Sequence, residues 1–158
     1  MQPISMWDTM FASGVRAAYV ASHFAAMMMV PCKSGLIVNI SFRAAQRYMG
    51  NIAYGVSKAA TDRLTEDMAH DLKGYNVAVV SLYPGLVRTE RVMRASRYMD
   101  LSNSESPRFV GRTVCALMSD EEILTKTGNV LTTSDLAKEY GFTDIDGKLS
   151  EMLVFDDQ

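Results

Sequence analysis

The 158-residue sequence predicts an α/β fold built around a parallel sheet. Apolar segments with strand character at 35–41, 76–82 and 128–131 alternate with longer segments of helical periodicity. The first two strands are nearly continuous apolar runs, as is typical of strands buried on both faces of a parallel sheet. The helices between the strands indicate right-handed crossover connections. We therefore expect a single α/β domain over residues 1–158.

The first element should be a long helix over residues 7–29. This stretch is largely apolar, and Pro31 follows it at the point where the helix would end. The strand over 35–41 comes next. Residues 42–51 have no periodic pattern and are expected to form a loop.

A second long helix is expected over residues 54–72, and Gly74 should end it. Apolar residues recur there at helical spacing, at Val56, Ala59, Ala60, Leu64, Met68 and Leu72. The strand over 76–82 follows, and the dipeptide Pro84-Gly85 should close it with a turn.

The last part of the chain has weaker patterns. Residues 90–107 are polar, which predicts a mobile segment with a short helix. A helix over 109–118 and a strand beginning at 128–131 should follow. The tail over 141–158 is acidic and is expected to lie at the periphery.

Composition and charge exclude several classes of partner. The net charge of −2 and the scattered arginines and lysines leave no basic patch for nucleic acid or an anionic membrane surface. Cys32 and Cys115 lack the spacing of a zinc site, and we expect no metal. The apolar run at 17–30 is interrupted by Ser22 and His23 and is too short to span a bilayer.

Three residues are candidates to surround one reacting carbonyl. Tyr54 and Lys58 are four positions apart on the second helix, so their side chains share a face. The Lys58 ammonium would favour the ionised form of the phenol, since a free tyrosine titrates near 10. Ser41 ends the first strand and supplies a hydroxyl donor for a developing oxyanion. The trio suits proton transfer coupled to carbonyl reduction or alcohol oxidation.

The Tyr-x-x-x-Lys spacing alone is weak evidence, because Tyr54 can equally be a first-turn aromatic and Lys58 a solvated helix residue. Their position along the chain strengthens it. Ser41 ends one strand and Pro84-Gly85 follows the next, and ligands bind at the carboxyl ends of parallel strands. A hydrolase is a poorer interpretation, because Ser41 lies in no Gly-x-Ser-x-Gly elbow.

At these residues the sequence resembles the short-chain dehydrogenase/reductase family. Ser41, Tyr54 and Lys58 match the order and spacing of its catalytic serine, tyrosine and lysine. The resemblance implies that Tyr54 protonates the carbonyl oxygen in reduction and acts as the base in the reverse direction. Lys58 would lower the pKa of Tyr54 and hold the ribose hydroxyls of the cofactor, and Ser41 would orient the substrate oxygen.

The segment after the second strand carries the resemblance further. Pro84-Gly85-Leu-Val87-Arg-Thr89 is similar to the family's Pro-Gly-x-Val-x-Thr turn, which wraps the nicotinamide end of the cofactor, NADP or NAD. Pro84 and Gly85 would shape the turn, while Val87 and Thr89 would contact the carboxamide region. Residues 90–107 would form the substrate lid, and the substrate would be a small carbonyl compound or alcohol.

Two departures from the family pattern affect these expectations. Family members begin with a strand and a glycine-rich turn that bring the pyrophosphate to a helix N-terminus, and this sequence shows neither. We therefore expect an incomplete doubly wound, Rossmann-like sheet without the N-terminal nucleotide-binding strands and without a pyrophosphate and adenosine site. Gly14 also stands where many members have a catalytic asparagine, which affects the proton relay and favours a helix kink.

The incomplete sheet has consequences for behaviour. The strand over 35–41 would become an exposed edge, and the chain by itself should bind nicotinamide cofactor weakly and be inactive. The alternative is a non-catalytic interaction protein of the same family, able to form a homodimer through its two long helices. The amino end lacks the pattern of a signal peptide, so we expect an intracellular protein, cytoplasmic or, by resemblance, in the endoplasmic reticulum.

Overall fold

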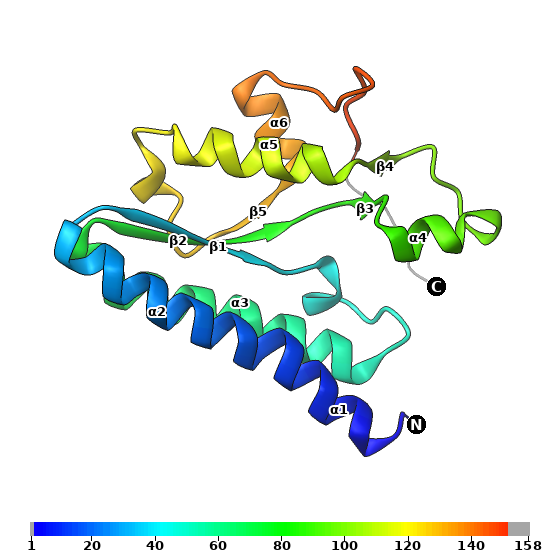
Figure 1. Cartoon of the computed structure of the whole chain (residues 1–158), viewed down its shortest axis with the longest axis horizontal. Coiled ribbons are helices and arrows are strands. Elements are labelled where there is room, and N and C mark those ends of the chain that lie inside the picture. Colours follow the sequence, from blue (N-terminus) through cyan, green and yellow to red (C-terminus); the bar gives the residue numbers. More distant parts are fainter. Residues whose placement is uncertain (1, 152–158) are drawn as a thin grey trace. The chain divides into compact units, whose positions relative to one another are not determined.

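The computed structural model describes residues 2–151, and the chain divides into two compact units (Figure 1). The first unit comprises residues 1–82 and 121–130, and the second comprises residues 83–120 and 131–158. Helices and strands alternate along the chain, and the paired strands β1 and β2 are parallel. The α/β class is thus confirmed, while the expectation of a single domain stays a prediction.

The sheet order places β2 in the middle of three strands. The order is β1-β2-β5, with bounds of Gly35–Ile40, Val77–Tyr83 and Val130–Thr132. The parallel register sets Gly35 opposite Val77 and Ile40 opposite Leu82. Every residue of β2 is buried, as its continuous apolar run predicts.

The strand β1 is less buried than its sequence suggests. Only Ile37 and Asn39 are buried, and Ile40 is 47% exposed. The prediction that this strand is buried on both faces is therefore wrong. β1 stands at the end of the strand order, so within residues 2–151 its outer edge has no neighbouring strand.

A long helical segment occupies the region predicted as one helix over 7–29. It consists of α1 (Ile4–Met10), a π-helical turn (Phe11–Arg16) and α2 (Ala17–Cys32). Gly14 lies inside the π-helical turn, a form that often marks functional sites. Pro31 does not end the helix. Lys33 does so instead, with a φ of 49° and its N–H donating to the Val30 carbonyl at 3.1 Å.

The helix α3 (Ile52–Leu72) confirms the second long helix but buries a different face. Its buried side chains are Ala53, Ser57, Thr61, Thr65, Ala69 and Leu72, and only Leu72 belongs to the apolar set noted in the sequence. The hydroxyls of Thr61 and Thr65 donate to carbonyls one turn earlier, at 2.9 and 3.0 Å. Short side chains whose polar groups are already bonded let the helix approach its neighbours closely.

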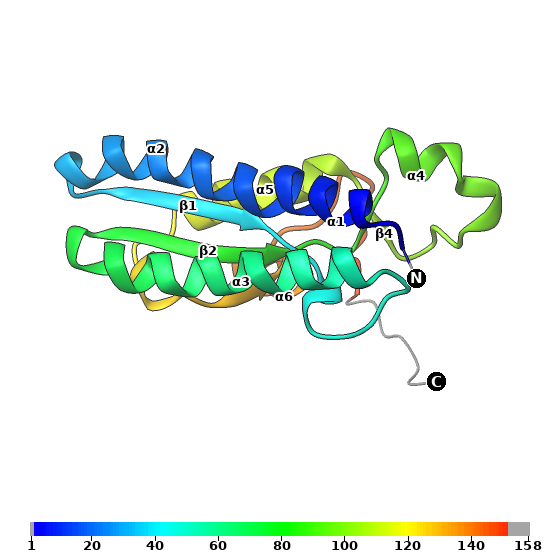
Figure 2. The ribbon, with the colours of Figure 1, turned by 90° about the horizontal axis from the view of Figure 1, so that it is seen from below.

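Figures 1 and 2 show α2 and α3 side by side against the same face of β1 and β2. The apolar core of the first unit fills the space between them. Its buried members are Ile37, Ala69, Leu72, Val77 and Val79, and Ala25, Ala26, Met29, Val30 and Met68 pack against them.

The second unit is built from short elements. They are β3 (Leu86–Val87), α4 (Glu90–Arg94), a 3₁₀ turn (Ser96–Tyr98), β4 (Ser104–Glu105), α5 (Pro107–Met118) and α6 (Thr133–Tyr140). The short helix predicted within 90–107 is α4, and the helix predicted over 109–118 is α5. The strands β3 and β4 and the helix α6 were not predicted from the sequence.

The tail over 141–158 is expected to be peripheral, and this stays a prediction. Most residues of its described part, 141–151, are exposed, and two are buried. Asp144 and Ser150 are each only 5% exposed and form hydrogen bonds within the second unit. Residues 152–158 lie outside the described part of the chain.

Candidate active site

Ser41 lies directly after β1 and is 2% exposed. Its N–H donates to the Leu82 carbonyl at 2.9 Å, which extends the pairing of β1 with β2 by one residue. Its hydroxyl donates to the Lys58 carbonyl at 3.3 Å. The end of the strand and the first part of α3 are thereby joined at Ser41.

Tyr54 lies in the first turn of α3 because Asn51 caps that helix. The Asn51 side-chain oxygen accepts a hydrogen bond from the Tyr54 N–H at 3.0 Å. The Tyr54 ring is partly buried and lies 6.4 Å from the ring of Phe42, between centroids. The cap fixes where α3 begins, and so fixes the direction of the tyrosine.

Lys58 lies one turn further along α3, on the side of Tyr54. Its Nζ is 5.7 Å from the centroid of the Tyr54 ring and donates to the Ile40 carbonyl at 3.0 Å. The first unit thus brings together Ser41, Tyr54 and Lys58, as the sequence predicts, and adds a backbone carbonyl to them.

The electrostatics of the pair differ from the expectation drawn from sequence. Burial raises the pKa of Tyr54 above its ordinary value. Burial also lowers the pKa of Lys58, partly offset by the charge of Asp62. The ammonium lies over the Tyr54 ring and donates to the Ile40 carbonyl, so desolvation dominates the pKa of the phenol.

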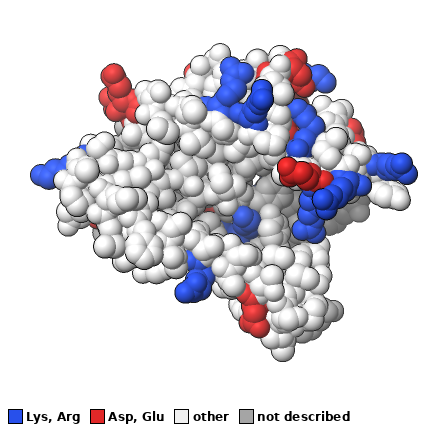
Figure 3. Space-filling view, in the orientation of Figure 1, with Lys and Arg blue, Asp and Glu red and all other residues white. Residues whose placement is uncertain are grey.

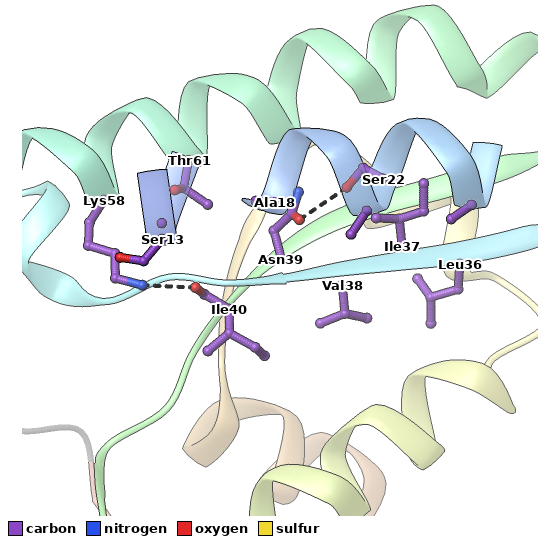
Figure 4. Close-up of a pocket in the computed structure, with 13 residues that line it drawn as sticks. Ser13, Ala18, Ser22, Leu36, Ile37, Val38, Asn39, Ile40, Lys58 and Thr61 are labelled. Carbon is purple, nitrogen blue, oxygen red and sulfur yellow. Dashed lines mark hydrogen bonds between the residues drawn. The ribbon is translucent and has the colours of Figure 1, made fainter. Parts of the chain in front are cut away.

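A pocket of about 390 Å³ opens along the outer side of β1 and includes Lys58. Figure 4 shows Lys58 and Ser13 pointing into it, with Thr61 on the α3 side, and Leu36, Val38 and Ile40 directed to the opposite face of the strand. Ser41 and Tyr54 do not line this pocket. Lys58 is therefore the only member of the trio that faces it.

A buried polar group below the site escaped the sequence analysis. Asn39 is 6% exposed, its amide donates to Thr65 at 2.9 Å, and its oxygen accepts from Ser22 at 3.4 Å. It ties β1 to both α2 and α3 two residues before Ser41. An asparagine within an apolar strand was the available signal.

Gly14 meets α3 beside the site. A Cβ added there would lie 3.8 Å from the Ser57 hydroxyl, which is ordinary contact. The neighbouring Ser13 hydroxyl donates to the Thr9 carbonyl at 2.7 Å. The space at Gly14 is thus open enough for a small side chain, and its match to the family's asparagine stays a prediction.

The remaining predicted cofactor residues lie in the second unit. Pro84 and Gly85 precede β3, Val87 ends it, and Thr89 caps α4 by accepting from the Val92 N–H at 3.4 Å. The Thr89 N–H donates to the Val87 carbonyl at 2.7 Å, which gives this segment its tight bend.

Other kinds of site find no support in the described residues. Within residues 2–151, no group of three or more His, Cys, Asp or Glu side chains is arranged to hold a metal ion. None of the helices described there has the length and apolar character needed to cross a lipid bilayer. On the face drawn in Figure 3, Lys and Arg side chains lie singly or in small groups, with Asp and Glu side chains among them.

Comparison with known proteins identifies relatives over most of the chain. A family model described as short chain dehydrogenase matches residues 2–100. Dehydrogenase/reductase SDR family member 1 of Mus musculus is 42% identical over 159 residues, covering 92% of this chain and 51% of that protein. The chain therefore spans about half the length of this relative. Short stretches such as Met6-Trp7-Asp8 and Asp135-Leu136-Ala137 favour a resemblance to this member, and the comparison confirms it.

Solved structures of dehydrogenases are also similar to this chain. Acetoin dehydrogenase from Enterobacter cloacae is 26% identical with a TM-score of 0.69, covering 83% of this chain and 55% of that one. A 4-hydroxyisoleucine dehydrogenase complexed with NADH is 28% identical with a TM-score of 0.62, covering 75% of this chain and 53% of that one.

Proposed function

This chain belongs to the short-chain dehydrogenase/reductase family, and from that premise we propose that it carries the proton-transfer part of a nicotinamide-dependent oxidoreductase site. Tyr54, Lys58 and Ser41 would act there on a carbonyl or an alcohol. The observation that carries the proposal is the meeting of these three residues in the first unit, through the bond from Ser41 to the Lys58 carbonyl and the placement of Lys58 over the Tyr54 ring.

The protonation state of Tyr54 suits the reductive direction. A phenol with its ordinary pKa near 10 is protonated at neutral pH, and carbonyl reduction needs a proton donor. Burial raises the pKa of Tyr54 and so weakens it as an acid, an effect that a nearby bound positive charge would oppose. Tyr54 would transfer its proton to the carbonyl oxygen and be left as a phenolate, which has to regain a proton from solvent before the next turnover. A reduced nicotinamide, when bound, would supply the hydride for the carbonyl carbon. The positive charge gained by the oxidised nicotinamide then balances the negative charge of the phenolate.

Ser41 would hold the substrate oxygen during that step. Its hydroxyl is buried and donates to a carbonyl of its own chain, so it has to turn from Lys58 toward the substrate to donate there. A hydroxyl on the end of a paired strand is held in place by the sheet, which favours its use as a positioned donor.

Each unit carries groups that would suit the nicotinamide end of a cofactor. In the first unit, Lys58 places an ammonium donor at a pocket and would bond ribose hydroxyls. In the second unit, the backbone of Val87 and the Thr89 hydroxyl would serve a carboxamide. A pyrophosphate and adenosine site is not part of this proposal. NADP is preferred to NAD on the resemblance, and the location, cytoplasmic or in the endoplasmic reticulum, is proposed on the same ground.

Homodimer formation through the long helices is also part of the proposal. Tyr19, Phe24, Met27 and Met28 on α2 are 54 to 68% exposed, an apolar surface that a second copy would cover. Phe24→Glu should shift the protein from dimer to monomer in light scattering after size exclusion. A dimer that survives Phe24→Glu and Met28→Glu together would contradict this interface.

The test of the catalytic role is Tyr54→Phe in a polypeptide that joins this sequence to the nucleotide-binding strands of the family. Turnover of small ketones with NADPH should fall by at least about a hundredfold, since general acid catalysis contributes that much or more. Calorimetric binding of NADPH should remain, because the ring and Lys58 are kept. Tyr75→Phe, at an exposed tyrosine, is the matched control.

Unchanged turnover by Tyr54→Phe would refute the role of the phenol.

The 158-residue chain by itself is expected to bind NADPH and NADH only weakly. Low-micromolar binding of either would show that the pyrophosphate and adenosine site is not needed or is present.

A further inference from the structure

In the second unit, a group of polar residues joins the two ends of the segment 90–103. Arg88 precedes that segment, and Ser104, Glu105 and Ser106 follow it. The strands β3 and β4 pair in parallel there, with Val87 opposite Glu105, and the segment with α4 projects from them as a loop (Figure 1). We call Arg88, Ser104, Glu105, Ser106 and Asp144 the base cluster.

Arg88 spans the base cluster from one side. Its guanidinium donates through Nη1 to the Ser104 carbonyl at 2.7 Å and to the Ser104 hydroxyl at 3.0 Å. Through Nη2 it pairs with the Asp144 carboxylate at 3.2 Å. Its N–H donates to the Glu105 carbonyl at 2.8 Å. One side chain and one backbone group thus connect the start of the segment to its end.

Asp144 completes that connection from the tail. Its carboxylate accepts from the Ser106 N–H at 2.7 Å, from the Ser106 hydroxyl and from the Ile145 N–H at 2.7 Å. Burial acts to raise the pKa of Asp144, but these hydrogen bonds and the charge of Arg88 outweigh it and hold the pKa below its ordinary value. Asp144 is thus an ionised group with a full set of partners.

Glu105 fixes the turn itself. Its side chain is 1% exposed, and its Oε1 accepts from the Thr133 hydroxyl at 2.6 Å and from the Ser150 hydroxyl at 2.9 Å. A Cβ added to Gly85 would lie 2.8 Å from that same oxygen. The carboxyl therefore fills the space where any larger residue at Gly85 would place its side chain.

The other carboxylate oxygen of Glu105, Oε2, is in a different situation from Oε1. Oε2 is buried and has no hydrogen-bond partner among residues 2–151. An unpaired buried polar atom opposes folding. The carboxyl is therefore held by Oε1 alone, and a glutamine keeps that contact.

We propose that Glu105 and the Arg88–Asp144 pair are positioning residues, which hold the Pro84–Thr89 turn and the base of the 90–103 segment in one fixed arrangement. Glu105 does so by packing on Gly85, and Arg88 and Asp144 do so by joining the two ends of the segment. The effect on the cofactor rests on the proposed function, because it assumes that this turn meets the nicotinamide. The fixation of the 90–103 segment does not rest on the proposed function.

Trypsin provides a test that needs no cofactor. Arg91, Arg94 and Arg97 are exposed cleavage sites within the segment, and their cleavage reports how often it opens. Gly85→Ala should raise their cleavage about tenfold, because the added Cβ displaces a carboxyl that two hydroxyls hold in place. Glu105→Ala should raise it similarly, and Glu105→Gln should leave it near the wild-type rate.

The double variant Gly85→Ala with Glu105→Ala is the decisive measurement. Both changes act through one contact, so the second should add little to the first. If the two changes multiply each other's effect on the cleavage rate, the coupling of Gly85 to Glu105 is refuted. A wild-type cleavage rate in Glu105→Ala would refute it as well. Leu117→Val, in the buried part of α5, is the control for general loosening and should not favour these three sites over others.

Kinetics of the polypeptide that joins this sequence to the nucleotide-binding strands of the family separate this inference from the proposed function. Glu105→Ala should raise the KM for NADPH more than it lowers kcat, and Glu105→Gln should restore both. If cleavage responds as described and no variant shows cofactor-dependent turnover, the base cluster stands and the proposed function fails. If the wild type is active and Glu105→Ala changes neither cleavage nor KM, the positioning role fails.

Discussion

The two units hold their candidate site residues by different means. In the first, Ser41 and Tyr54 stand at the ends of long, regular elements, and their directions follow from strand pairing and a helix cap. In the second, the turn that contains Gly85 rests on two strands of two residues each and on side chains such as Arg88 and Asp144. Backbone regularity positions the first group, and buried side-chain chemistry positions the second.

This difference predicts which changes each unit tolerates. The first unit should respond mainly to loss of apolar volume. The second should respond to loss of charge and hydrogen bonds, and therefore to pH.

The largest effect is expected from Leu82→Ala in β2. Leu82 is fully buried, and truncating such a side chain destabilises a protein by about 2–5 kcal/mol. Val87→Ala, at a half-buried position of β3, is the comparison and should be clearly milder. Urea unfolding measures both. Equal losses would show that the second unit depends on apolar burial as much as the first.

An intermediate effect is expected from Asp144→Asn. Its lowered pKa means that the carboxylate contributes stability above its unfolded pKa near 3.9, and that this contribution is lost as pH falls through the folded pKa. The variant should lose about 1–3 kcal/mol at neutral pH, where an ionised acceptor is removed. In acid it should approach the wild type.

Unfolding midpoints measured across the acid range check this prediction. Asp100→Asn is a suitable control, because Asp100 also has a lowered pKa, due to Ser102, but is fully exposed. A constant difference between the Asp144→Asn variant and the wild type at every pH would contradict an ionic role for Asp144.

The smallest effect should come from the helix caps. Asn51→Ala removes the cap of a 21-residue helix and should cost about 1 kcal/mol. Thr89→Ala removes a longer hydrogen bond, at 3.4 Å, from the five-residue α4, and should cost less. Thermal melts of the two variants compare them directly. A larger loss of stability from Thr89→Ala than from Asn51→Ala would contradict this prediction.

The helices and strands of the first unit could largely be predicted from the sequence, because their apolar patterns extend over many residues. Runs such as 76–82 and 54–72 give enough periods to distinguish a strand from a helix, and Tyr54, Lys58 and Ser41 match a specific pattern within them. The apolar periodicity of α3 predicts the wrong buried face, because threonine counts as a polar residue in such a pattern and Thr61 and Thr65 are buried. Bonded to carbonyls of their own helix, they pack as small side chains do.

The second unit was less visible for a physical reason. Strands of two residues, such as β3 and β4, have no periodicity to detect. Glu105 and Asp144 look like ordinary surface charges until the fold buries them. What identifies them is their partners, which are distant in sequence, 28 residues from Glu105 to Thr133 and 56 from Arg88 to Asp144.

The bond from Lys58 to the Ile40 carbonyl uses one of the three N–H donors of the ammonium. A ribose hydroxyl can therefore bond to Lys58 without displacing that carbonyl. The carbonyl also holds the flexible lysine side chain in one place before a ligand arrives, so less side-chain freedom is lost when the ligand binds. The end of β1 thus prepares the lysine for a ligand as well as positioning Ser41.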